Sequence, residues 1–175
     1  LKEMVLRLKN LSLQDELTNL YNRRGFITLA EQQMKVAKRN NKGLLVLFID
    51  VDNLKVINDQ FGHEVGDEAL KSVAKALRLS FRDSDIVARL GGDEFVVMVL
   101  DTTMENFPRI CRVIQMNIRT INEENQIKVP VEVSIGCAEY DPLLDPSVER
   151  LMAEADRKMY QQKTAKKKNP EKQGK

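Results

Sequence analysis

Two adjacent carboxylates, Asp93 and Glu94, directly follow the glycine pair Gly91-Gly92. The runs on both sides are β-branched or apolar, which is typical of two strands joined by a tight hairpin. Glycines at such a turn leave room for a backbone or a ligand to approach. Paired carboxylates on a rigid turn suit a hard divalent cation. From the turn alone, an acidic surface hairpin is an equally good interpretation.

A second pair of acids, Asp50 and Asp52, ends the most apolar run of the chain, residues 43–51. That run predicts a central strand covered on at least one face. If it lies beside the hairpin, four carboxylates converge, and they cannot stay close and ionised without a compensating cation. Oxygen ligands favour Mg²⁺ or Mn²⁺ over zinc. An EF-hand is excluded because Leu54 and Lys55 stand where that loop needs a ligand and a glycine.

The residues after this strand suit a nucleotide. Magnesium held by few carboxylates usually shares its remaining positions with substrate phosphates. The backbone amides of Asn53 and Leu54, at the start of a predicted short helix, can hold phosphate oxygens beside Lys55. Asn58 and Asp67 can then read a base edge, since a carboxylate accepts from the ring N–H and exocyclic amine of guanine. Adenine does not present that pair.

The elements that must position these residues follow from hydrophobic periodicity and turn residues. Helices are predicted over 1–11, 23–39, 55–59, 67–80, 103–122 and 146–163, with a turn-rich stretch at 61–66. Strands are predicted over 43–51, 85–89, 96–100 and 129–139. This order predicts an α+β fold in which helices flank an antiparallel sheet, as in ferredoxin-like and polymerase-palm domains. In such a sheet the first strand lies beside the hairpin, which brings the two acidic pairs together.

Composition narrows the class of protein. A length of 175 residues with 42% hydrophobic residues suits one domain with a real core. The net charge of +2 gives no field that points to nucleic acid or to an anionic membrane. No apolar run approaches the ~20 residues of a membrane span, so we expect a cytoplasmic domain without membrane contact. Cys111 and Cys137 are expected to be reduced core residues.

The two ends of the chain have their own patterns. Apolar residues recur at helical spacing over residues 1–14, which predicts an amphipathic helix. It either packs on its own domain or continues a coiled-coil linker from an upstream sensor. Because the chain begins at Leu1 rather than Met, we expect a piece of a longer protein. The lysine-rich end is expected to fray from Thr164, with a disordered tail over 168–175.

Five motifs in order and at family spacing resemble the GGDEF domains, the diguanylate cyclases that make cyclic di-GMP. They are DELTNLYNRR (15–24), FIDVDNLKVINDQFGHEVGDEAL (48–70), ARLGGDEF (88–95), VSIG (133–136) and EADRKMYQQK (154–163). The resemblance covers residues 15–167, which we take as the domain, and implies a nucleotide-cyclase-like fold. It implies that two GTP molecules, one per subunit of a homodimer, condense to cyclic di-GMP and two pyrophosphates.

The resemblance also implies roles for individual residues. A metal ion would be bound by Asp50, the Val51 carbonyl, Asp93 and Glu94, with Asp50, Asp93 and Glu94 as the catalytic carboxylates and Asp93 as general base. Asn58 and Asp67 would contact guanine, and Lys55 and Lys163 would contact phosphates. The full set expected at the substrate is Asn53, Leu54, Lys55, Asn58, Asp67, Gly91, Gly92, Lys163 and Lys167.

The chain departs from the family pattern at two places. Asn19 stands where the family usually has glycine, which we interpret as a structural variation. Lys166-Lys167-Lys168 replaces an expected glycine–arginine–asparagine end. Lys167 would then stand in for a phosphate-facing arginine, and lysine supplies charge without the bidentate fork.

Arg82 and Asp85 fit the RxxD product site of the same family. The five residues Ile86–Leu90 separate Asp85 from Gly91, which is the family spacing. Arginine can pair with the O6/N7 edge of guanine while aspartate accepts its N–H groups. We therefore expect an allosteric site for cyclic di-GMP, completed by Arg109 or Arg112. The alternative is an ordinary exposed pair at a helix end.

Three functions remain open from the sequence. A diguanylate cyclase is favoured because Asp50, Asp93 and Glu94 are all present. The main alternative is a catalytically silent domain that acts as a receptor for GTP or cyclic di-GMP. A structural dimerisation module would fit the N-terminal helix but leaves the carboxylates unexplained.

Overall fold

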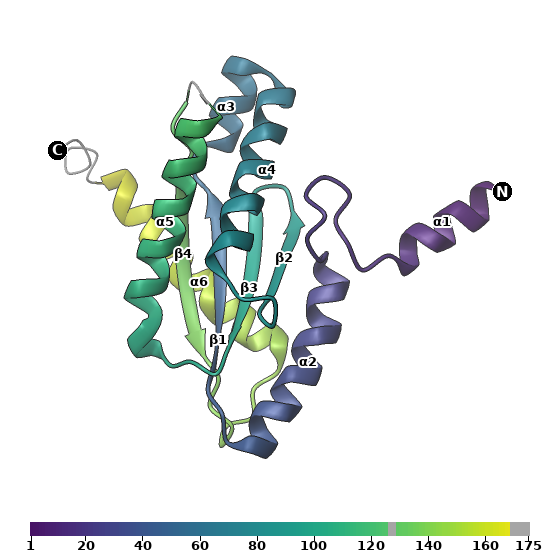
Figure 1. The fold of residues 1–175 in the computed structure, drawn as a ribbon, viewed down its shortest axis with the longest axis vertical. Coiled ribbons are helices and arrows are strands. Elements are labelled where there is room, and N and C mark those ends of the chain that lie inside the picture. The colour runs from purple at the N-terminus through teal and green to yellow at the C-terminus, as the bar shows by residue number, and fades with distance from the viewer. Residues whose placement is uncertain (126–128, 169–175) are drawn as a thin grey trace.

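The computed structural model describes residues 1–125 and 129–168, without the side chains of residues 6, 7 and 9–11. Its centre is a four-stranded sheet with the order β2-β3-β1-β4, and every neighbouring pair is antiparallel (Figure 1). The strands are β1 (Leu44–Val51), β2 (Ile86–Gly91), β3 (Glu94–Leu100) and β4 (Val133–Glu139). The predicted α+β fold with a ferredoxin-like sheet flanked by helices is confirmed.

Strand β1 separates two hydrophobic cores. Leu45, Leu47 and Ile49 face a core shared with α4 (His63–Ser80) and α5 (Phe107–Glu124). Side chains of the opposite parity face α2 (Arg23–Asn40) and α6 (Val148–Lys168). All residues of β1 are buried because both faces of the strand are covered, which explains its nearly continuous apolar sequence.

The prediction of a turn-rich stretch at 61–66 is wrong. Helix α3 (Leu54–Phe61) and helix α4 are separated by Gly62 alone. Gly62 has φ +90°, a conformation that side-chain-bearing residues rarely adopt, and this lets the chain reverse within one residue. As a result α4 begins four residues earlier than the predicted Asp67.

Other boundaries also differ from the prediction, most of them by one or two residues, and three differences are larger. Helix α5 begins at Phe107, after the short 3₁₀ helix η1 (Met104–Asn106), with Pro108 in its first turn where a missing N–H is tolerated. Strand β4 begins at Val133 instead of Val129. Helix α6 extends to Lys168, so the fraying expected from Thr164 is wrong as far as that residue. The rest of the predicted tail, 169–175, lies outside the described residues.

The N-terminal segment has two parts. Helix α1 (Lys2–Leu11) projects away from the body of the domain (Figure 1) and exposes Met4, Val5 and Leu8. Residues 12–22 instead pack against β2, where Tyr21 forms a parallel bridge with Ala88. The Tyr21 carbonyl accepts a 2.8 Å hydrogen bond from the Arg89 amide. The segment therefore extends the sheet at the edge formed by β2.

Asn19 lies in the segment that follows α1, and its backbone has φ +57°. Asparagine visits this left-handed region more readily than most residues with a side chain. The departure from the family's glycine therefore preserves the backbone conformation.

Both cysteines are free and lie in the core-facing parts of their elements. Burial raises the pKa of Cys111 to about 11 and that of Cys137 to about 12. Both thiols are therefore protonated at neutral pH and behave as small apolar side chains. Among the described residues, no helix is long and apolar enough to span a bilayer.

Candidate active site

The candidate active site lies where β1 ends beside the β2–β3 hairpin. Asp50 is directly opposite Glu94 on β3 and opposite Ser134 on β4. The Val51 amide donates a 3.0 Å hydrogen bond to the Asp93 carbonyl, which fixes the hairpin turn against the end of β1. The prediction that the first strand meets the hairpin is therefore confirmed.

The turn itself is open. Gly91 and Gly92 have φ +130° and +51°, and a register shift interrupts the β2–β3 pairing at Gly91. A Cβ at either glycine would have no atom within 4 Å. The glycines are thus required by backbone conformation, and they leave the space that a ligand backbone or phosphate would need.

Among the acids of the site, Asp50 has the most strongly shifted pKa. Its side chain is nearly buried, and its Oδ2 accepts a 2.7 Å hydrogen bond from Lys163 Nζ. Its Oδ1 is buried without a hydrogen-bond partner. Burial, reinforced by the neighbouring Asp93 carboxyl, raises the pKa of Asp50 to about 7. A proton shared between these acids, or a cation, would satisfy the free oxygen.

Asp52 does not join this pair, which corrects the expected convergence of four carboxylates. Its Oδ1 accepts a 2.8 Å hydrogen bond from Ser134 Oγ, and its Oδ2 lies 3.0 Å from Lys166 Nζ. Lys163 and Lys166 of α6 place positive charge beside Asp50 and Asp52. Across the described residues, no three acidic, histidine or cysteine side chains surround a common metal position.

Glu94 occupies a crowded acidic position. Burial raises its pKa, and repulsion from Asp156 and Asp93 adds to the effect, while Arg23 and Lys163 oppose it. For Lys163, burial disfavours the charged form, but the hydrogen bond and attraction to Asp50 outweigh burial and raise its pKa. The acids of the site outnumber the nearby cations Lys163, Lys166 and Arg23, a balance that favours binding of a further cation.

Oxygen donors and an unpartnered buried carboxylate oxygen fit a hard divalent ion. Asp50 provides that oxygen, and Asp93 and Glu94 lie beside it at the turn. The ligand set of Asp50, the Val51 carbonyl, Asp93 and Glu94 remains a prediction for this chain.

The residues predicted to hold phosphates begin α3. Asn53 has φ +58° and precedes the helix without capping it through its side chain. Leu54 is the first helical residue, and Lys55 is exposed beside it. The α3 N-terminus thus follows β1 directly, as the sequence predicted.

The residues predicted to read guanine lie where α3 meets α4. A Cβ at Gly66 would overlap the side-chain amide of Asn58, so glycine is what allows the two helices to touch there. Asp67 follows Gly66 and is exposed. The structure thus brings Asn58 and Asp67 to the same helix junction.

Sequence reasoning missed Arg89. Its guanidinium donates to both carboxylate oxygens of Asp15 at 3.0 and 3.2 Å and to the Gly92 carbonyl at 2.8 Å. Asp15 also accepts from the amide and hydroxyl of Thr18. Arg89 therefore ties the hairpin turn to the segment that follows α1. The two motifs were visible in the sequence, but nothing in it paired them across 74 positions.

Lys166 was also missed, because Lys167 was expected to face the site. Lys167 is exposed, whereas Lys166 contacts Asp52 and donates a 2.6 Å hydrogen bond to the Val133 carbonyl. The family pattern has glycine at this position. Because glycine has no side chain, comparison with the family could not have predicted this contact.

Arg82 and Asp85 lie in the turn between α4 and β2. Asp85 is buried, and its two carboxylate oxygens accept 3.0 Å hydrogen bonds from the amides of Arg82 and Leu100. Asp85 therefore fixes the turn to the end of β3. Arg82 is exposed, and Asn117 of α5 binds Ser80 nearby. Arg109 and Arg112 are exposed on α5, and neither was seen to contact Arg82 among the described interactions.

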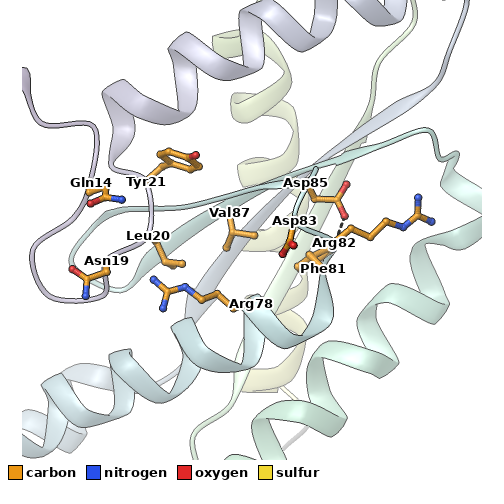
Figure 2. A pocket seen from close by; sticks show the side chains of 10 residues that line it. All are labelled: Gln14, Asn19, Leu20, Tyr21, Arg78, Phe81, Arg82, Asp83, Asp85 and Val87. Atoms are coloured by element: carbon orange, nitrogen blue, oxygen red, sulfur yellow. Dashed lines mark hydrogen bonds between the residues drawn. The ribbon is translucent and has the colours of Figure 1, made fainter.

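A pocket of about 280 Å³ lies between the N-terminal segment and the end of α4. Figure 2 shows the side chain of Arg82 extending away from Leu20 and Arg78, while the latter two lie close together. Arg78 also donates to the Thr18 carbonyl at 2.9 Å. Arg82, Asp83 and Asp85 also line this pocket, although the Arg82 guanidinium points away from Leu20 and Arg78 (Figure 2).

Comparisons with known proteins support the family resemblance indicated by the five sequence motifs. A family model described as "Diguanylate cyclase, GGDEF domain" matches residues 12–169. The chain belongs to the GGDEF family. Diguanylate cyclase DosC of Escherichia coli K12 is 38% identical over 151 residues, which cover 83% of this chain and 32% of DosC. The chain spans less than half the length of the curated relatives it matches.

Solved GGDEF domains have the same fold. The GGDEF-only form of TpbB (YfiN) from Pseudomonas aeruginosa is 33% identical with a TM-score of 0.73, and the match covers 87% of this chain and 89% of that one. The GGDEF domain of DgcB from Caulobacter crescentus, solved in complex with cyclic di-GMP, is 25% identical with a TM-score of 0.77. That match covers 90% of this chain and 91% of DgcB's solved chain.

Proposed function

We propose that this GGDEF domain is a diguanylate cyclase, which condenses two GTP molecules into cyclic di-GMP and releases two pyrophosphates. The observation that carries the proposal is the buried Asp50 at the end of β1, which has one unpartnered carboxylate oxygen, lies beside the half-buried Asp93 of the turn and is bonded to Lys163. These groups provide acceptors for a hard cation and a positive charge for a triphosphate. The relatives named as diguanylate cyclases support the same reaction.

In this proposal Mg²⁺ or Mn²⁺ is held by Asp50, the Val51 carbonyl, Asp93 and Glu94. The ion, when bound, makes the ionised carboxylates compatible with one another and neutralises phosphate charge. Asp93 accepts the proton of a ribose 3′-hydroxyl. The 3′-oxygen forms a bond to the α-phosphorus of the second GTP, and the bond to pyrophosphate breaks. A second such step closes the ring.

The remaining site residues hold the substrate. The Asn58 amide can both donate to and accept from the guanine edge, and the Asp67 carboxylate accepts from the ring N–H and the exocyclic amine. The amides of Asn53 and Leu54, with Lys55, hold phosphate oxygens at the start of α3. Lys163 contacts the triphosphate, Lys167 adds charge near it, and Gly91-Gly92 leave room for the nucleotide.

The reaction needs two domains, because each binds one GTP. We propose a symmetric homodimer in which residues 1–14 serve as a linker helix from an upstream sensor. The exposed stripe formed by Met4, Val5 and Leu8 supports pairing of α1 with a second copy. Control of dimer geometry would then be control of activity.

We also propose that Arg82 and Asp85 form the product site, with Arg109 or Arg112 contributing a second guanidinium. Arg82 is the exposed member and contacts the guanine of cyclic di-GMP. Asp85 holds the turn through two backbone amides, and each of its oxygens retains a second lone pair for a guanine N–H.

The test is a turnover assay on the purified chain with GTP and Mg²⁺, with a leucine zipper fused at the N-terminus to force dimers. We expect cyclic di-GMP and pyrophosphate in a one-to-two ratio, and Glu94→Gln is the inactive control. GTP binding without product would instead favour a nucleotide receptor. An absence of both binding and product would leave a structural dimerisation module.

Base choice gives a second test. Asp67→Asn replaces an acceptor with a group that also donates, and a mismatched guanine N–H costs about 1–3 kcal/mol. GTP binding, measured by calorimetry, should weaken while ATP binding changes little. An equal loss for both nucleotides would place Asp67 outside the base site.

A further inference from the structure

The last turns of α6 are held to the sheet by polar contacts. Met159 is the last buried residue of the helix. Up to that point α6 is fixed closely, because a Cβ at Gly136 of β4 would clash with backbone atoms of Ala155 and Met159. Beyond it, Gln162 Oε1 accepts a 2.6 Å hydrogen bond from the Ile135 amide, and the two lysines reach the end of β1. The position of Lys163 therefore depends on the contacts around it.

Lys163 and Lys166 form two parallel ion pairs with β1. The lysines are three residues apart and so share one face of α6, while Asp50 lies in β1 and Asp52 directly follows the end of that strand. Lys166 Nζ lies 3.0 Å from Asp52 Oδ2 and donates to the Val133 carbonyl at 2.6 Å. The side chains of this second pair are 23% and 10% exposed, which is dry enough for the pair to resist solvent screening.

The two lysines differ in how many of their N–H donors are already used in hydrogen bonds. Each carries three N–H donors. Lys166 uses donors on Asp52 and on a backbone carbonyl, while the contact described for Lys163 is the single one to Asp50. Lys163 is thus better placed to donate to phosphate oxygens, and Lys166 is better placed to hold the helix.

We propose that Lys166 is a positioning residue for substrate binding. It anchors the end of α6 to Asp52 and Val133, and thereby fixes Lys163 at the place where the GTP triphosphate binds. The glycine that the family usually has at this position can form no such side-chain contact. This inference rests on the proposed function, because it assumes that the site accepts GTP.

Equilibrium binding of GTP and GMP to the forced dimer tests the inference, with magnesium present and a non-hydrolysable GTP analogue in place of GTP where turnover interferes. We expect Lys166→Met to weaken GTP binding about tenfold, or about 1.4 kcal/mol, because Lys163 loses its fixed position. GMP binding should be unchanged, because GMP lacks the β- and γ-phosphates. Lys166→Arg should restore most of the affinity. Lys168→Met, at an exposed lysine of the same helix end, is the matched control, with less than a twofold change expected.

A double variant separates positioning from a purely structural role. If Lys166 acts through Lys163, adding Lys166→Met to Lys163→Met should cause no further loss of GTP affinity. Additive losses, or equal losses for GTP and GMP, would overturn the inference. Should Lys166→Met fail to fold, Lys166→Gln keeps a donor and serves in the same cycle.

The outcomes also separate this inference from the proposed function. A wild-type chain that binds no GTP overturns both. A wild-type chain that binds GTP as tightly as Lys166→Met overturns the inference alone.

Discussion

Asp50 and Asp85 are equally buried, each 8% exposed, yet their surroundings are opposite. Both oxygens of Asp85 accept hydrogen bonds from backbone amides, so the carboxylate completes the turn before β2. Asp50 has one oxygen without a partner and a second acid beside it, and its pKa is raised to about 7. A buried acid whose two oxygens both accept backbone hydrogen bonds stabilises a fold, whereas one with an unpartnered oxygen points to a ligand.

The largest expected effect comes from removing the charge of Asp50. In the dimer assay, Asp50→Asn should lower cyclic di-GMP formation by roughly a thousandfold or more, because the metal site loses a carboxylate. The fold should survive with equal or greater thermal stability without metal, since the substitution removes repulsion with Asp93. Product formed at the wild-type rate would show that Asp50 does not serve the metal.

The opposite pattern is expected for Asp85. Asp85→Ala leaves the amides of Arg82 and Leu100 without their acceptor, which should lower the free energy of unfolding by about 2–4 kcal/mol. Urea denaturation would measure this loss, with Asp83→Ala, an exposed neighbour, as the control. Unchanged stability would remove the structural role that separates Asp85 from Asp50.

The pH dependence of stability should single out Asp50. Its pKa is raised from 3.8 to about 7 on folding, so the folded state binds the proton more tightly than the unfolded chain. This contribution is fully present below pH 3.8 and is lost as the pH rises through about 7. In thermal melts with a chelator, the stability of Asp50→Asn should therefore increase relative to that of the wild type from about pH 5 to about pH 8. A constant difference would mean that Asp50 is ionised throughout.

The smallest effect on basal turnover is expected at Arg82. Arg82→Ala leaves the turn between α4 and β2 intact, since Arg82 contributes only its backbone amide to Asp85. Initial rates should stay within about twofold, while calorimetry should show about tenfold weaker binding of cyclic di-GMP through loss of a guanine contact. Equal product affinity in both proteins would leave Arg82 and Asp85 as a structural turn alone.

Features that depend on periodicity were predictable from the sequence. The apolar run ending in Asp50 identified the central strand, and the glycine pair before Asp93 identified the hairpin that meets it. The start of α4 was not predictable in the same way. His63 and Glu64 follow Gly62 without a side-chain cap, so the sequence around them resembles a turn.

Contacts between distant side chains were beyond sequence reasoning. Lys166 and Asp52 are 114 positions apart, and each belongs to a motif that is complete without the other. Their pairing depends on the depth to which α6 packs on β4, and periodicity carries no information on that depth. The sequence likewise could not show that Asp85 would be buried and bonded to the Leu100 amide, because a polar residue at a turn does not reveal whether a neighbouring strand will cover it.

The segment that pairs with β2 has a consequence for solubility. An unpaired edge strand exposes a row of amides and carbonyls that can add a strand from another molecule and begin aggregation. Here the bridge from Tyr21 to Ala88, with the bond from the Arg89 amide, occupies part of that edge. A truncated domain that starts after Tyr21 would leave those groups free. Expressed forms of this domain should therefore include residues 12–22, and we expect forms that lack this segment to precipitate more readily.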